Sequence, residues 1–297
     1  MAIDEFQPME FLRRHTHALV KWTAVVSEDW HKELPVHPIV PKTLIADTDC
    51  CPVLLDLAEL NNAQMDRLYW NLVEAEKYSY RHLLSSLLYV PPEVSTKSLV
   101  FHLTNKVIPD AHHTTGQILV LNYYMPMVFP HMWRIFSPER IRQLFGPIKE
   151  WSIPFQNEWT TFTPPETTGV IPRYWSATNE QVQSVLRIGL INQIFEYRME
   201  ATGMRWANLD EFHADATKLD QILVFAEQHY QMRDKDDLIS FGLHAMLYGT
   251  DFHRHPKIQE MLKDVAQKGW GYTPNSMDLT EEDWQAIAAW RPVTPTD

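Results

Sequence analysis

The spacing of apolar positions predicts a helical C-terminal half. Residues 182–194 carry apolar side chains at near-helical intervals, directly after Thr178 and Gln181, a pair that is typical of a helix-capping box. The same spacing predicts four further helices, which cover residues 216–230, residues 236–248, the stretch after Pro256 and a short segment capped by Thr280. The pattern contains no strand signal, so we predict an all-α C-terminal lobe.

Short apolar runs alternate with helical patterns in the N-terminal half. Strands are predicted over residues 43–46, 98–103 and 118–124, the last being rich in Ile, Val and Tyr and ended by Pro126. Helices are predicted over residues 8–22, 52–60, 63–89 and 126–135, and over a stretch that Ser137 caps and Gly146-Pro147 ends. This alternation predicts an α/β lobe with a small sheet of mixed or parallel order.

A proline-rich stretch separates the two halves. Prolines recur between residues 147 and 172, residues 153–162 could pair as a hairpin, and Pro164-Pro165 through Gly169 is typical of a linker. We therefore expect two domains, an α/β lobe over residues 1–165 and a helical, partner-binding lobe over residues 166–297.

Composition narrows the class of partner. The chain has 297 residues, of which 26 are basic and 38 acidic, which gives a net charge of −12. Nucleic acids and anionic membranes both require a concentrated positive field, so neither is expected as the main partner. A hydrophobic content of 45% is sufficient for a sizeable core.

The cysteines and the N-terminus indicate the compartment. Only Cys50 and Cys51 occur, and because neighbouring cysteines rarely bridge, no disulfide framework is expected. The N-terminal residues lack the apolar core of a signal peptide, and no apolar run approaches the roughly 20 residues of a membrane-spanning helix. We expect a cytoplasmic protein.

Two acidic or histidine-rich segments could carry chemistry. Asp251–His255 places two imidazoles two residues apart, where they could share a metal ion, and Asp47 with Asp49 could hold a divalent ion after a strand. Each also fits a simpler interpretation, as solvated loop residues or as turn and capping residues. Glycine-rich phosphate loops and nucleophile-elbow motifs are missing from the sequence.

Aromatic residues are the other candidates for function. The chain has 11 Trp, 11 Tyr and 13 Phe, most of which should pack in the core. Trp and Tyr are also strong interface anchors, and several aromatics fall near predicted loops and helix ends. The candidate partner-binding residues are Trp175, Trp206, Phe252, Trp270 and Trp284.

Two ordered sets of residues resemble a known family. The first set is Tyr123, Tyr124, Pro126, Phe145, Gly146, Pro147, Ile148 and Trp151. The second is Phe241, Tyr248, Gly249, Phe252, Pro256, Ile258 and Leu262. Their order and separation resemble the effector chaperone/adaptor family of bacterial type VI secretion, whose shared domain was first catalogued as one of unknown function. Asn122 and Met125 stand where that family carries an arginine and an aspartate.

The resemblance implies a non-enzymatic adaptor without a cofactor or metal. Such a protein binds a cognate toxic effector and helps to load it onto the spike protein of the secretion apparatus. It also implies that the first set is mainly structural and that partner contacts lie in the helical half. The alternative, from the residues alone, is a metal-dependent hydrolase or transferase that uses Asp47 and Asp49 or the Asp251–His255 cluster.

Overall fold

The computed structural model divides the chain into two compact units, Met1–Val185 and Leu186–Asp297. The division lies after the boundary predicted between residues 165 and 166. The residues that the structure describes are 8–21, 34–41, 43, 51–75, 84–111, 119–156, 158–268 and 271–290.

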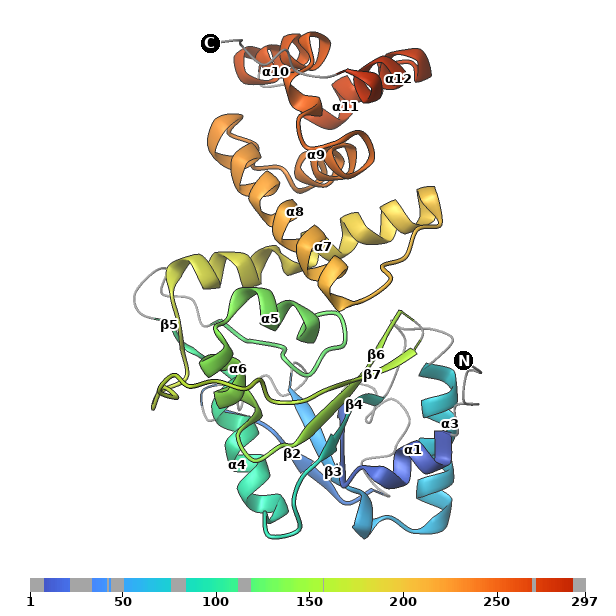
Figure 1. The fold of residues 1–297 in the computed structure, drawn as a ribbon, viewed down its shortest axis with the longest axis vertical. Coiled ribbons are helices and arrows are strands. Elements are labelled where there is room, and N and C mark those ends of the chain that lie inside the picture. The colour runs from blue at the N-terminus through green and yellow to red at the C-terminus, as the bar shows by residue number, and fades with distance from the viewer. Residues whose placement is uncertain are drawn as a thin grey trace. The chain divides into compact units, whose positions relative to one another are not determined.

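A six-stranded sheet organises the first unit, with strand order β2-β3-β1-β4-β6-β7 (Figure 1). Its strands are β1 (His17–Lys21), β2 (Val36–Pro38), β3 (Pro52–Asp56), β4 (Leu84–Tyr89), β6 (Glu150–Phe155) and β7 (Glu158–Phe162). Every neighbouring pair is antiparallel, so the predicted mixed or parallel order is wrong for this sheet. The predicted hairpin over residues 153–162 is confirmed as β6–β7.

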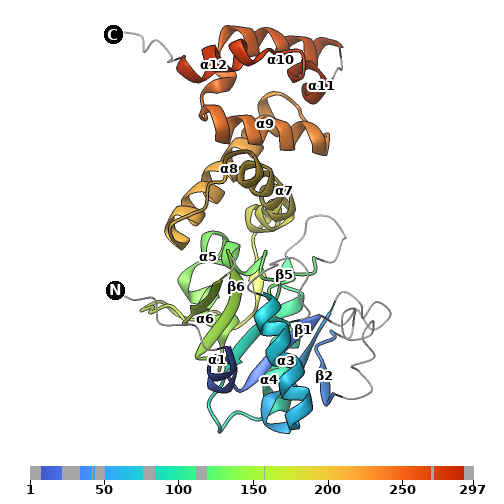
Figure 2. The ribbon, with the colours of Figure 1, turned by 90° about the vertical axis from the view of Figure 1, so that its right-hand side faces the viewer.

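Helices cover both faces of this sheet. α1 (Pro8–Arg14) and α3 (Asn62–Ala75) lie on one side, and α4 (Thr96–Val107) lies on the other (Figures 1 and 2). Successive strand residues point to opposite faces, so Ala18 and Val20 of β1 join the core beneath α1 and α3. The α/β prediction for this half is confirmed.

The aromatic residues of the first family-like set form a core around Trp151. The Trp151 ring lies 4.6 Å from Phe129, 5.7 Å from Tyr123 and 5.8 Å from Phe145, measured between ring centroids. Tyr123 is fully buried, and its hydroxyl donates to the Leu103 carbonyl of α4 at 3.0 Å. These positions therefore have packing roles.

Several predicted elements of the first unit are wrong. The helix predicted over 8–22 ends at Arg14, and residues 52–60 begin with strand β3. The helix predicted over 63–89 gives way to β4, while the strand predicted over 98–103 belongs to helix α4. Residues 119–124 form no strand, and residues 44–46 and 118 lie outside the described residues. Short leucine-rich runs fit either element, so contacts with distant segments decide between them.

The helices of the C-terminal half, after the proline-rich stretch, follow the prediction closely. They are α7 (Asn179–Thr202), which crosses the division between the units, α8 (Leu209–His229), α9 (Lys235–Tyr248), α10 (Pro256–Lys268), α11 (Tyr272–Ser276) and α12 (Glu281–Ala289). Both predicted capping boxes form: the Thr178 hydroxyl accepts from Gln181 N at 3.3 Å, and Thr280 pairs reciprocally with Asp283. The all-α prediction is confirmed.

Within the described part of the chain, no helix is both long enough and apolar enough to span a bilayer.

Candidate partner-binding site

Helix α6 (Pro138–Phe145) holds the proline strap, which we define as residues 163–175. Arg140 donates to the Tyr174 carbonyl and, at 2.7 Å, to the Ser176 hydroxyl. Gln143 Nε2 donates to the Pro172 carbonyl at 2.7 Å. These bonds satisfy the backbone carbonyls of Pro172 and Tyr174 in the strap. The strap is therefore fixed against α6, although it has no regular secondary structure.

Trp175 ties the end of the strap to α4. Its indole N–H donates to the Lys106 carbonyl at 3.1 Å, and its backbone carbonyl accepts from Asp110 N at 2.8 Å. A parallel pair of β5 (Asp110–Ala111) and β8 (Ser176–Ala177) continues this contact. Trp175 is only 6% exposed, so it forms a fixed wall.

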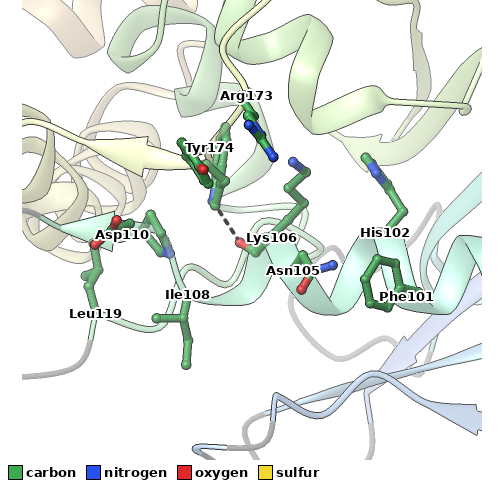
Figure 3. A pocket seen from close by; sticks show the side chains of 11 residues that line it. Phe101, His102, Asn105, Lys106, Ile108, Asp110, Leu119, Arg173 and Tyr174 are labelled. Carbon is green, nitrogen blue, oxygen red and sulfur yellow. Dashed lines mark hydrogen bonds between the residues drawn. The ribbon is translucent and has the colours of Figure 1, made fainter.

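Between α4 and the strap lies an open cavity of about 710 Å³ (Figure 3). Residues 101–110 line one side, residues 173–175 line the other, and Leu119 closes one end. In Figure 3 Phe101 and His102 lie at the opposite end, and the Lys106 side chain runs from α4 towards Arg173. The volume falls within the range of small-molecule or peptide side-chain sites.

The rim of this cavity exposes two aromatic rings. Phe101 of α4 is 71% exposed, and Tyr174 of the strap is 66% exposed. Phe101 and Asn105 are spaced at i and i+4, which places them on one face of α4, and Ile108 follows as the extended residue that ends the helix. Exposed aromatics beside a hollow are typical of interaction sites.

Lys106 gives the cavity its charge. The residue is only 7% exposed, and its ammonium nitrogen lies 5.3 Å from the centre of the Trp175 ring. Burial, with the Arg140 guanidinium as a second cause, lowers the pKa of Lys106 to about 8, so the amine remains mostly protonated at neutral pH. Among the described residues, no carboxylate lies within ion-pairing distance of Lys106 or Arg173.

His102 closes the cavity beneath Phe101 as a neutral group. Burial lowers its pKa to about 4, and Nε2–H donates to the Leu144 carbonyl at 2.8 Å. Gly146 lies against the imidazole: a Cβ there would be 2.1 Å from His102 Cε1, and the backbone φ is +55°. Only glycine satisfies both the contact and the conformation.

The aromatic residues predicted to contact a partner have packing roles in this structure. Trp175, Phe252 and Trp284 are buried at 6%, 2% and 8% exposure. Trp206 is half-buried, and its indole N–H donates to Asp215 at 3.0 Å. Trp270 lies outside the described residues. Partner contact by these residues stays a prediction, whereas the exposed aromatic residues that line the cavity are Phe101 and Tyr174.

The two departures from the family-like pattern lie in one tight turn. Met125 N donates to the Asn122 carbonyl at 2.9 Å, and Pro126 follows as a buried residue. The side-chain oxygen Oδ1 of Asn122 is buried and has no hydrogen-bond partner among the described residues. The position at which the family carries an arginine therefore contains an unsatisfied polar atom here.

The histidines of the Asp251–His255 cluster have local hydrogen-bond partners. His253 Nδ1 lies 2.9 Å from the Tyr230 hydroxyl, and His255 Nδ1 accepts from Lys257 N at 3.3 Å at the start of α10. Asp251 forms an exposed ion pair with Arg254 at 3.3 Å. Within the described residues no three His, Cys, Asp or Glu side chains are grouped to hold a metal ion. Asp47 and Asp49 lie outside them, and Cys51 is a buried cysteine.

Sequence reasoning singled out Trp175, which lines the cavity, but not Phe101, Lys106, Arg173 or Tyr174. Phe101 fell in the strand predicted over residues 98–103 and Lys106 lay just after it, whereas Arg173 and Tyr174 lay just after the linker predicted through Gly169. The sequence signal that could have indicated the cavity is the end of the proline strap, where basic and aromatic residues occur together as Arg-Tyr-Trp.

Comparison with known proteins gives no relative for this chain. No protein-family model, curated protein or solved structure matches it.

Proposed function

We propose that this protein is a non-enzymatic adaptor that binds a cognate secreted effector and the spike protein of a type VI secretion apparatus in the cytoplasm of the producing cell. The observation that carries the proposal is the cavity between α4 and the proline strap, where exposed Phe101 and Tyr174 lie beside buried Lys106, for which the described part of the chain provides no carboxylate partner. The two ordered sets of family-like residues supply the class of partner.

The mechanism is stoichiometric binding. A partner segment that enters the cavity covers Phe101 and Tyr174 and supplies contacts that the free chain lacks. Because ligand binding to a folded state stabilises that state by mass action, an effector with a poorly stable segment gains stability while it is held. Release at the spike then requires only that the spike complex compete for the same contacts.

Affinity capture from the native cell tests this proposal. The tagged full-length chain should recover one large effector and a spike protein, identified by mass spectrometry. Recovery of neither protein would refute the adaptor function.

A matched pair of surface variants locates the contact. Phe101→Ser removes an exposed ring from the cavity, whereas Trp70→Ser removes an exposed ring of α3 that does not line it. We expect Phe101→Ser to recover at least about tenfold less effector than Trp70→Ser, because a central aromatic anchor contributes this much to binding. Equal recovery by both variants would place effector binding elsewhere.

A further inference from the structure

We propose that the cavity between α4 and the proline strap binds the carboxylate of an aspartate or glutamate in an extended segment of a partner protein, with an apolar residue two positions away against Phe101. This inference rests on the proposed function only in taking the ligand to be a protein. It is carried by Lys106, a buried cation that points into the cavity (Figure 3).

The first step concerns charge. A buried ammonium group without a carboxylate is costly, and proteins ordinarily pair such groups. The charged groups around Lys106 are Arg140 from α6, Arg173 from the strap and Asp110 beyond the end of α4, with His102 neutral on the same helix. Positive charge therefore predominates at the centre of the cavity, and an anion there would compensate it.

The surrounding chain does not cancel this attraction. The whole protein carries a net charge of −12, yet charges separated by more than about 8 Å are largely screened at physiological ionic strength. Lys106 and Arg173 line the same cavity, so they act on a bound group at short range. A basic site on an acidic protein selects where an acidic segment binds.

The second step concerns the kind of anion. Lys106 lies in the last turn of α4, where the helix dipole presents partial negative charge, and Asp110 lies close by. Both features disfavour a doubly charged phosphate, which proteins usually bind at helix N-termini or in glycine-rich loops. A singly charged carboxylate fits better the positive charge that remains after the helix C-terminus and Asp110 are taken into account.

The third step concerns the neighbours of the carboxylate. Phe101, Ile108 and Leu119 give the cavity apolar surface on either side of Lys106. In an extended peptide, residues i and i+2 point to the same side at a separation of about 7 Å. An acidic residue with an apolar residue two positions away in the sequence can therefore place both groups in the cavity at once.

A peptide selection tests this inference with the full-length protein. A random peptide library displayed on phage is selected in parallel on wild type, on Lys106→Met and on Lys97→Met, an exposed lysine of α4 that does not line the cavity. We expect wild type and Lys97→Met to enrich peptides in which Asp or Glu lies two positions from an apolar residue, and Lys106→Met to lose that enrichment by about tenfold or more.

Binding of the selected peptides sharpens the result. Replacing the acidic residue by its amide should weaken binding to wild type about tenfold and should have little effect on Lys106→Met. Inorganic phosphate at the same ionic strength should compete no better than acetate.

Three outcomes would overturn the inference: selection of no peptides, equal acidic enrichment on Lys106→Met, or competition by phosphate but not by acetate. Circular dichroism of Lys106→Met checks that it folds, and Arg173→Gln provides an exposed second variant that should weaken binding in the same direction. If the selection fails while native capture still depends on Phe101, the adaptor function stands and only the carboxylate assignment is lost.

Discussion

Among the described residues, each unit contains one buried lysine or arginine, and the charges of the two are compensated differently. In the second unit Arg187, 9% exposed, has its Nε 2.5 Å from Asp220 and its Nη1 3.8 Å from Glu227. In the first unit Lys106, 7% exposed, has the face of Trp175 and no carboxylate within the described residues. A compensated buried charge holds helices together, whereas an uncompensated one beside an open cavity is available to a ligand.

Breaking the compensated pair should have the largest effect on stability. Asp220→Asn keeps the shape of the side chain but leaves Arg187 with only the distant Glu227, so the free energy of unfolding should fall by about 3 kcal/mol. Urea unfolding followed by circular dichroism measures this. Lys218→Gln, an exposed change on the same helix, is the control, and equal stability of both variants would mean that the Arg187 pair has no structural role.

A second prediction concerns the buried, neutral His244 of the second unit. Burial lowers the pKa of His244 to about 4, and Nδ1 lies 2.7 Å from the Tyr272 hydroxyl. Because the unfolded chain binds this proton near pH 6.5, stability should fall as the pH drops from about 6.5 to 4, by at most about 3 kcal/mol from this group. His244→Gln should reduce the acid dependence in unfolding curves. An unchanged pH profile would contradict the lowered pKa.

The smallest effect on the free energy of unfolding should come from removing the charge of Lys106. Lys106→Met should raise the free energy of unfolding at pH 7 by on the order of 1 kcal/mol, since it removes a buried ammonium group that is partly screened at the cavity mouth. The folded-state pKa near 8 lies below the unfolded value, so wild type gains stability between pH 8 and about 10.5 and the difference should shrink there. A variant less stable than wild type at pH 7 would indicate that Lys106 has a structural partner.

The helices of the C-terminal half were predicted well because their signals are local. The Thr178–Gln181 and Thr280–Asp283 caps each lie within one turn, and the apolar spacing of α8 to α10 repeats over several turns. The strands β3 and β4 are short apolar runs whose character is fixed by pairing with β1. Those contacts join segments that are distant in the chain, so the apolar run alone does not show whether it forms a strand or a helix.

The cavity could not be predicted for a related reason. Lys106 is buried because Trp175, 69 residues later, bonds to its carbonyl and covers its side chain. The position of Trp175 in turn depends on Arg140 and Gln143 holding the strap. Contacts between residues so far apart in the chain produce no periodic pattern in the sequence. The sequence did show that basic and aromatic residues occur together at the end of the strap, as Arg-Tyr-Trp.

Effector capture by the lysine variants tests the central claim most directly. Tagged wild type, Lys106→Met and Lys97→Met are expressed in the native cell at equal levels, and the bound effector is quantified by mass spectrometry. The account predicts that Lys97→Met retains the effector at the wild-type level and that Lys106→Met, although folded, retains about one tenth or less. Equal retention by folded Lys106→Met would contradict the claim that this buried, uncompensated lysine binds the partner.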